Sequence, residues 1–201
     1  MTELALLQAV RFKGRVKRAD LAETLGEDPA DVDSTVARLT ESGLLVNDKT
    51  VKLSPDGRAR LGELLAHERR SIDRAAMTAI NDDFREVNAE FKAVVTDWQV
   101  KAGEPNTHQD TEYDAVILAR LDSVHQRVVP IVAAAAAQLP RLNTYSAKLQ
   151  KALDRVKAGD TAWLSRPIID SYHTVWFELH EELILAAGLT REAEARSGDA
   201  Q

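Results

Sequence analysis

Apolar residues recur at helical spacing along most of the chain, and short segments containing glycine or proline separate the helical runs. Val32, Val36 and Leu39 fall at positions i, i+4 and i+7, a spacing that predicts a helix with one buried face. Asp28-Pro29 supplies a capping carboxylate followed by proline, so we expect this helix to begin there and to end before Gly43. Shorter apolar stripes predict two preceding helices, in residues 1–12 and 19–25.

Two short apolar runs in residues 44–53 flank an Asn-Asp turn, a pattern typical of a two-stranded hairpin. Ser54-Pro55 then begins another helix by the same capping logic. The order expected in the first third of the chain is therefore helix, helix, turn, helix, hairpin and helix.

This order resembles the winged helix-turn-helix domain, and the residues are similar to its MarR-like version. Three segments carry the resemblance, which covers about residues 3–66: the second helix with its turn, the end of the recognition helix entering the wing, and the exit from the wing. They are Leu21-Ala22-Glu23-Thr24-Leu25-Gly26, Val36-Ala37-Arg38-Leu39-Thr40-Glu41-Ser42-Gly43-Leu44-Leu45 and Leu53-Ser54-Pro55-Asp56-Gly57-Arg58. The resemblance implies a transcriptional regulator whose winged domain, of three helices plus a two-stranded wing in residues 1–66, binds double-stranded DNA as a homodimer.

The remainder is expected to form a mainly α, all-helical domain over residues 67–189, entered by a long helix, with a frayed tail in residues 190–201. A seven-residue repeat of apolar positions marks the long helix and requires a partner surface, either other helices of this chain or a second copy. The repeat consists of Met77, Ile80, Phe84, Val87, Phe91, Val94 and Trp98. Further along, a polar loop is expected over residues 101–111, Pro130 is expected to interrupt a helix, and Pro167 is expected to open the last helix with Ile168 facing inward.

Composition narrows the class of protein. The chain has 201 residues and no cysteine, which excludes disulfides, thiolate zinc sites and cysteine nucleophiles. The net charge of −6 does not describe a strongly basic nucleic-acid binder, although the first sixty residues are electrically balanced. Because no stretch approaches roughly 18 consecutive apolar residues and the first residues do not form a secretory signal, we expect a cytoplasmic protein without membrane contact.

The candidate DNA contacts follow from the predicted recognition helix, its wing and the basic segment before the second helix. They are Arg15, Lys17, Arg18, Ser34, Thr35, Arg38, Lys49, Lys52 and Arg58. Arg38 can pair with guanine, and lysines in the wing can hold phosphates. Asp31 and Glu41 share the exposed helix face and oppose phosphate, so the alternative is a protein-interaction module built on a winged-helix scaffold.

Two predicted helices of the second domain carry candidate metal ligands. Asp122 with His125, and His173 with His180, offer nitrogen and oxygen ligands at helical spacing. A related arrangement occurs in the FCD group of GntR-like regulators, but there the first pair is four residues apart. We therefore favour the interpretation that these histidines are ordinary core or surface residues rather than metal ligands, and we expect no cofactor. The chain has no nucleophile elbow, phosphate loop or dinucleotide fingerprint, so enzyme activity is not expected.

A second resemblance lies near the C-terminal end. Residues 156–160 and 170–184 are similar to a helical segment of actinobacterial proteins linked to pyruvate phosphate dikinase. The resemblance implies a regulatory or accessory module linked to phosphoenolpyruvate and pyruvate metabolism, with a small-molecule effector or protein partner. The phosphohistidine and nucleotide-binding motifs of that enzyme are not recognisable, so its activity is not carried over.

Overall fold

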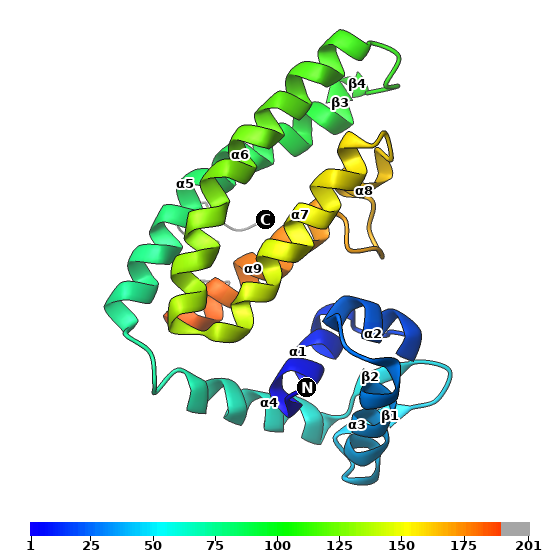
Figure 1. The fold of residues 1–201 in the computed structure, drawn as a ribbon, viewed down its shortest axis with the longest axis vertical. Helices are drawn as coiled ribbons and strands as arrows, with labels where there is room; N and C mark the ends of the chain where they lie inside the picture. The colour runs from blue at the N-terminus through cyan, green and yellow to red at the C-terminus, as the bar shows by residue number, and fades with distance from the viewer. Residues whose placement is uncertain (190–201) are drawn as a thin grey trace. The chain divides into compact units, whose positions relative to one another are not determined.

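A computed structural model describes residues 1–189 of the chain, which are mainly helical with two small antiparallel sheets. The chain divides into two compact units, and Figure 1 shows their elements. Unit 1 covers Met1–Ser71, and unit 2 begins at Ile72.

Unit 1 has the element order expected from the sequence. Its helices and strands are α1 (Glu3–Lys13), α2 (Arg18–Leu25), α3 (Pro29–Glu41), β1 (Leu45–Asn47), β2 (Val51–Leu53) and α4 (Pro55–Glu68). The apolar stripe of α3 is buried as its spacing requires, with Val32 and Val36 fully inaccessible. The same core takes in Leu6, Leu7, Val10, Leu21, Leu39, Val51 and Leu61.

Capping residues fix where the helices of unit 1 begin. The Asp28 carboxylate accepts a hydrogen bond from the Ala30 N–H at 2.8 Å, at the start of α3. The Ser54 hydroxyl accepts from the Gly57 N–H at 2.9 Å and donates to the Gly43 carbonyl at 2.6 Å. Ser54 therefore caps α4 and also ties it to the turn that ends α3.

Unit 2 is built around two long helices that lie side by side (Figure 1). These are α5 (Arg74–Gln99) and α6 (Thr111–Gln138), and a small ribbon of β3 (Val100–Lys101) and β4 (Glu104–Pro105) joins them. A 3-10 turn (Pro140–Asn143), α7 (Thr144–Lys157), α8 (Ala162–Ser165) and α9 (Tyr172–Ala187) complete the unit. Helix α9 packs on both α5 and α7.

The seven-residue repeat of α5 is buried within the chain. Met77, Phe84 and Phe91 have no exposed surface, and the rings of Phe84 and Phe91 contact rings of α9. The Phe91 and Trp176 rings stack with centroids 4.3 Å apart, and the Phe84 and Trp176 rings lie 4.9 Å apart. The sequence allowed the seam to pack either on helices of this chain or on a second copy. In the structure it packs on helices of the same chain, so its apolar side chains are not available to a second copy.

Three expectations for unit 2 were wrong in detail. Pro130 lies inside α6 without ending it, because its ring faces outward and only one helical hydrogen bond is lost. Pro167 does not start the last helix; Ser171 caps it instead, accepting from the Thr174 N–H. Ile168 is not inward but 96% exposed, with a left-handed φ of +81°.

The expected polar loop contains the β3–β4 ribbon, whose tight turn places Ala102 and Gly103 at positive φ. The expected frayed tail, residues 190–201, lies outside the described residues.

Candidate nucleic-acid interface

The exposed face of α3 carries the residues that were expected to read bases. Ser34 and Arg38 are exposed on it, opposite the buried stripe. Thr35 is partly buried, and its hydroxyl donates to the Asp31 carbonyl at 2.9 Å. The hydroxyl hydrogen is therefore used within α3 rather than directed outward. Asp31 and Glu41 are also exposed, which makes the face mixed in charge.

An isolated β-bridge joins Val16 to the hairpin, and the sequence pattern did not predict it. Val16 exchanges two backbone hydrogen bonds with Val51 of β2, with N···O distances of 3.1 and 2.8 Å. The Val16 side chain is buried, while its neighbours Arg15 and Lys17 are exposed. Because Val51 also pairs with Asn47 of β1, the bridge places the basic segment around Val16 beside the hairpin.

Five of the candidate cations have no ion-pair partner among residues 1–189: Arg15, Lys17, Arg38, Lys49 and Lys52. All five belong to α3, to the hairpin or to the Val16 segment that pairs with it. Cations without carboxylate partners remain available to an external anion such as a phosphate group.

The other candidate cations are engaged inside unit 1. Arg18 pairs with Asp33 of α3 at 3.3 Å, and both side chains are about half exposed. Arg58 donates to the Leu53 carbonyl at 3.3 Å, at the end of β2. Arg60, which follows on α4, bonds to Glu3 at 2.9 Å, and this contact raises the pKa of its guanidinium. These arginines already have partners within the domain, and the Arg18 guanidinium offsets the charge of the Asp33 carboxylate of α3.

The four candidate metal ligands are not brought together. The Asp122 carboxylate pairs with Lys157 at 2.7 Å. His125 lies between the Tyr172 hydroxyl and the Gln150 side chain, each 3.1 Å away. The rings of His173 and His180 pack on Phe91 and Phe84, respectively. Over residues 1–189, no group of three or more histidines, aspartates and glutamates is arranged to hold a metal ion.

Comparison with known proteins found no match to the chain among protein-family models, curated proteins or solved structures. None of the helices in the described part of the chain is both long and apolar enough to cross a bilayer.

Proposed function

We propose that unit 1 is a MarR-like winged helix-turn-helix domain that binds double-stranded DNA, and that the protein is a cytoplasmic transcriptional regulator. The observation that carries this proposal is the set of five unpaired cations on α3, the hairpin and the Val16 segment. The element order of α1 to α4, with a hairpin between α3 and α4, supports the same assignment.

In this function, α3 enters the major groove with Arg38 and Ser34 toward the base edges. Arg38 can donate two hydrogen bonds to guanine O6 and N7, and Ser34 can contact either a base or a phosphate. The carboxylates of Asp31 and Glu41 can accept from the cytosine amino group, which would turn the acidic part of the face into a sequence preference.

The hairpin and the Val16 segment hold the DNA backbone in this mechanism. Lys49 and Lys52 bind phosphates beside the groove that α3 enters, and Arg15 and Lys17, which flank the bridge residue Val16, extend the contact. Phosphate contacts of this kind position the protein without reading sequence, so specificity depends on α3.

The decisive experiment is selection of duplexes from a random pool at low salt, followed by affinity measurement with fluorescence anisotropy. We expect Arg38→Ala to weaken binding to the selected duplex by about 1–3 kcal/mol and to relax the preference at one base pair. Arg166→Ala, in an exposed loop of unit 2, is the matched control and should bind as the wild type does. Failure of the pool to enrich any duplex would contradict the proposal.

A second candidate function is favoured by the carboxylates of α3, Asp31 and Glu41, which have no ion-pair partner in residues 1–189. In that case the winged domain is a scaffold whose α3 face binds a basic protein surface, in a regulatory or accessory role such as one in phosphoenolpyruvate and pyruvate metabolism. The duplex selection separates the two candidates, because a protein-binding face would enrich no DNA sequence.

A homodimer and a response to an effector are part of the proposed regulator. Because the α5 seam is buried within the chain, pairing of two copies would use another surface. Light scattering of the purified protein, with and without the selected duplex, measures whether two copies assemble on DNA.

A further inference from the structure

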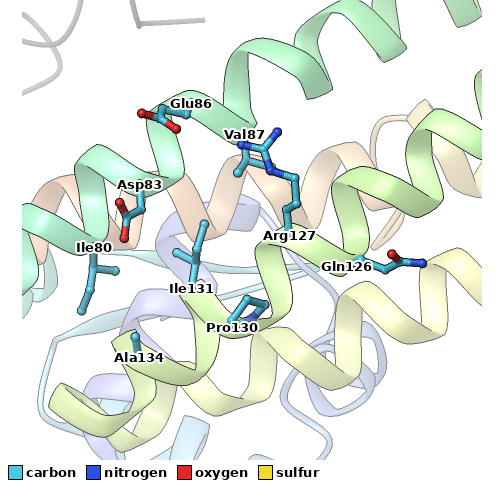
Figure 2. Close-up of a pocket in the computed structure, with 9 residues that line it drawn as sticks. All are labelled: Ile80, Asp83, Glu86, Val87, Gln126, Arg127, Pro130, Ile131 and Ala134. Carbon is cyan, nitrogen blue, oxygen red and sulfur yellow. The ribbon is translucent and has the colours of Figure 1, made fainter.

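Unit 2 has an open groove of about 470 Å³ between α5 and α6 (Figure 2). Its floor is apolar, with Ile80 and Val87 from α5 and Pro130, Ile131 and Ala134 from α6. Grooves of roughly 300–1,000 Å³ with a mostly apolar lining and a few polar groups are typical of sites for small organic ligands. The volume and the lining therefore fit a compact ligand with an apolar body.

Pro130 leaves one backbone carbonyl of α6 without its helical hydrogen-bond donor. Proline has no backbone N–H, so the Gln126 carbonyl loses the donor that the residue four positions later normally supplies. Gln126 and Pro130 both line the groove. A backbone carbonyl without its helical partner favours a ligand that can donate a hydrogen bond.

The α5 wall of the groove carries two carboxylates, Asp83 and Glu86 (Figure 2). Both are exposed, and neither has an ion-pair partner among residues 1–189. Arg127, the cation among the lining residues, is already paired with Glu90. The groove therefore presents uncompensated negative charge above an apolar floor.

We propose that this groove binds an amphipathic organic amine. The apolar body of the ligand lies on Ile80, Val87 and Ile131, and its protonated amino group lies near Asp83 and Glu86 with an N–H toward the Gln126 carbonyl. An anionic ligand would be repelled by the same carboxylates. A second copy packed through the same face about a two-fold axis would bring these like charges together, which argues against self-association here.

Two fluorescent probes with the same apolar body and opposite charges test this proposal. Dansylcadaverine carries a primary amine, and dansylaminohexanoate carries a carboxylate on a chain of similar length. The dansyl group shifts its emission when it leaves water, so titration of the full chain measures burial of the probe directly. We expect dansylcadaverine to bind at least roughly tenfold more tightly than the carboxylate.

Three variants locate the binding. Asp83→Asn combined with Glu86→Gln removes both charges with little change in shape and should weaken amine binding by roughly tenfold. Ala134→Phe fills the groove from an exposed helix position and should abolish binding of the amine, with helix content checked by circular dichroism. Glu104→Gln removes an exposed carboxylate of β4, outside the groove, and should leave binding unchanged.

Equal binding of the two probes, or amine binding that survives both groove variants, would overturn the proposal. Binding of a lysine-rich amphipathic helical peptide without binding of dansylcadaverine would also overturn it, because the groove would then be a protein-docking surface. None of these outcomes depends on DNA binding by unit 1, so this inference and the proposed function can fail separately.

Discussion

The indole N–H of Trp176 in α9 donates a hydrogen bond to the Asn88 side-chain oxygen in α5, at 2.9 Å. Both side chains are buried, so neither group can turn to water if the other is removed. This polar contact inside an aromatic cluster fixes the register between the two helices, because it can form in only one alignment of α5 and α9.

Asn88→Leu should lower the free energy of unfolding by about 1–3 kcal/mol, because it leaves the indole N–H buried without an acceptor. Urea denaturation followed by circular dichroism measures the change. Trp176→Phe removes the donor, and the double variant should be less destabilised than the sum of the two single changes. Strict additivity would show that the hydrogen bond contributes nothing.

Gly57→Ala and Gly62→Ala form a matched pair on α4. A Cβ at position 57 would lie 2.0 Å from the Leu44 carbonyl oxygen, whereas one at position 62 meets no atom within 4 Å. We expect Gly57→Ala to destabilise unit 1 by about 3 kcal/mol through displacement of the turn after α3. Gly62→Ala should stabilise it by about 0.5–1 kcal/mol, because alanine favours the helix. Thermal denaturation of both variants checks the opposite signs.

The stability of unit 2 should fall in mild acid because of His125. Burial is the largest cause that lowers the pKa of its imidazole, and the Lys157 ammonium adds to the shift, while Gln150, Asp122 and Asp154 oppose it. The unfolded chain takes up this proton near pH 6.5 and the folded chain only at lower pH, so protonation favours unfolding. The contribution of the neutral His125 imidazole to the free energy of unfolding is complete above about pH 6.5 and is lost as the pH falls through the folded-state pKa.

Urea denaturation between pH 7.5 and pH 5, repeated with His125→Gln, isolates this contribution. The wild type should lose stability more steeply than the variant, by roughly 1.4 kcal/mol for each unit of difference between the two pKa values. Parallel curves for the two proteins would contradict the assignment.

Ala102→Asn should stabilise the β3–β4 ribbon. Ala102 and Gly103 have φ values of +53° and +86°, and a two-residue turn of this kind favours asparagine at its first position. The expected gain is about 0.5–1 kcal/mol, seen as a rise in the melting temperature. Ala119→Asn, at an exposed position inside α6, is the control and should lower the melting temperature slightly.

If unit 1 binds DNA as proposed, Lys49→Ala should change the salt dependence of binding. Loss of one phosphate contact lowers the slope of log affinity against log salt by about 1 and weakens binding evenly across sequences. Arg166→Ala should keep the wild-type slope. An unchanged slope in Lys49→Ala would place the hairpin away from the DNA backbone.

Local chemistry made much of the fold predictable. Asp28-Pro29 and Ser54-Pro55 begin helices where capping rules place them, and Gly26 and Gly43 end helices with positive φ. The prediction that Pro167 starts the last helix was wrong because a proline is compatible with both the first turn of a helix and an extended segment. Ser171 marks the start of α9 more accurately, because its hydroxyl accepts a hydrogen bond from the Thr174 N–H.

The features that were missed depend on contacts distant in the chain. Val16 forms a β-bridge only through its pairing with Val51, and a single valine between basic residues gives no periodic pattern that would predict it. The sequence also did not decide which surface the α5 seam packs against. A seven-residue repeat requires a complementary apolar surface but does not indicate whether the same chain or a second copy supplies it. Among the expected DNA contacts, the pairing of Arg18 with Asp33 likewise emerged only from the packing of α2 against α3.

If the protein is a DNA-binding regulator as proposed, the burial of the α5 seam within the chain has a consequence for how the regulator responds to its own concentration. Because the α5 seam does not require a second copy for its burial, assembly on a paired operator would depend on protein concentration and on the DNA. Occupancy of that operator would then rise steeply with protein level, which would make the output sensitive to gene dosage.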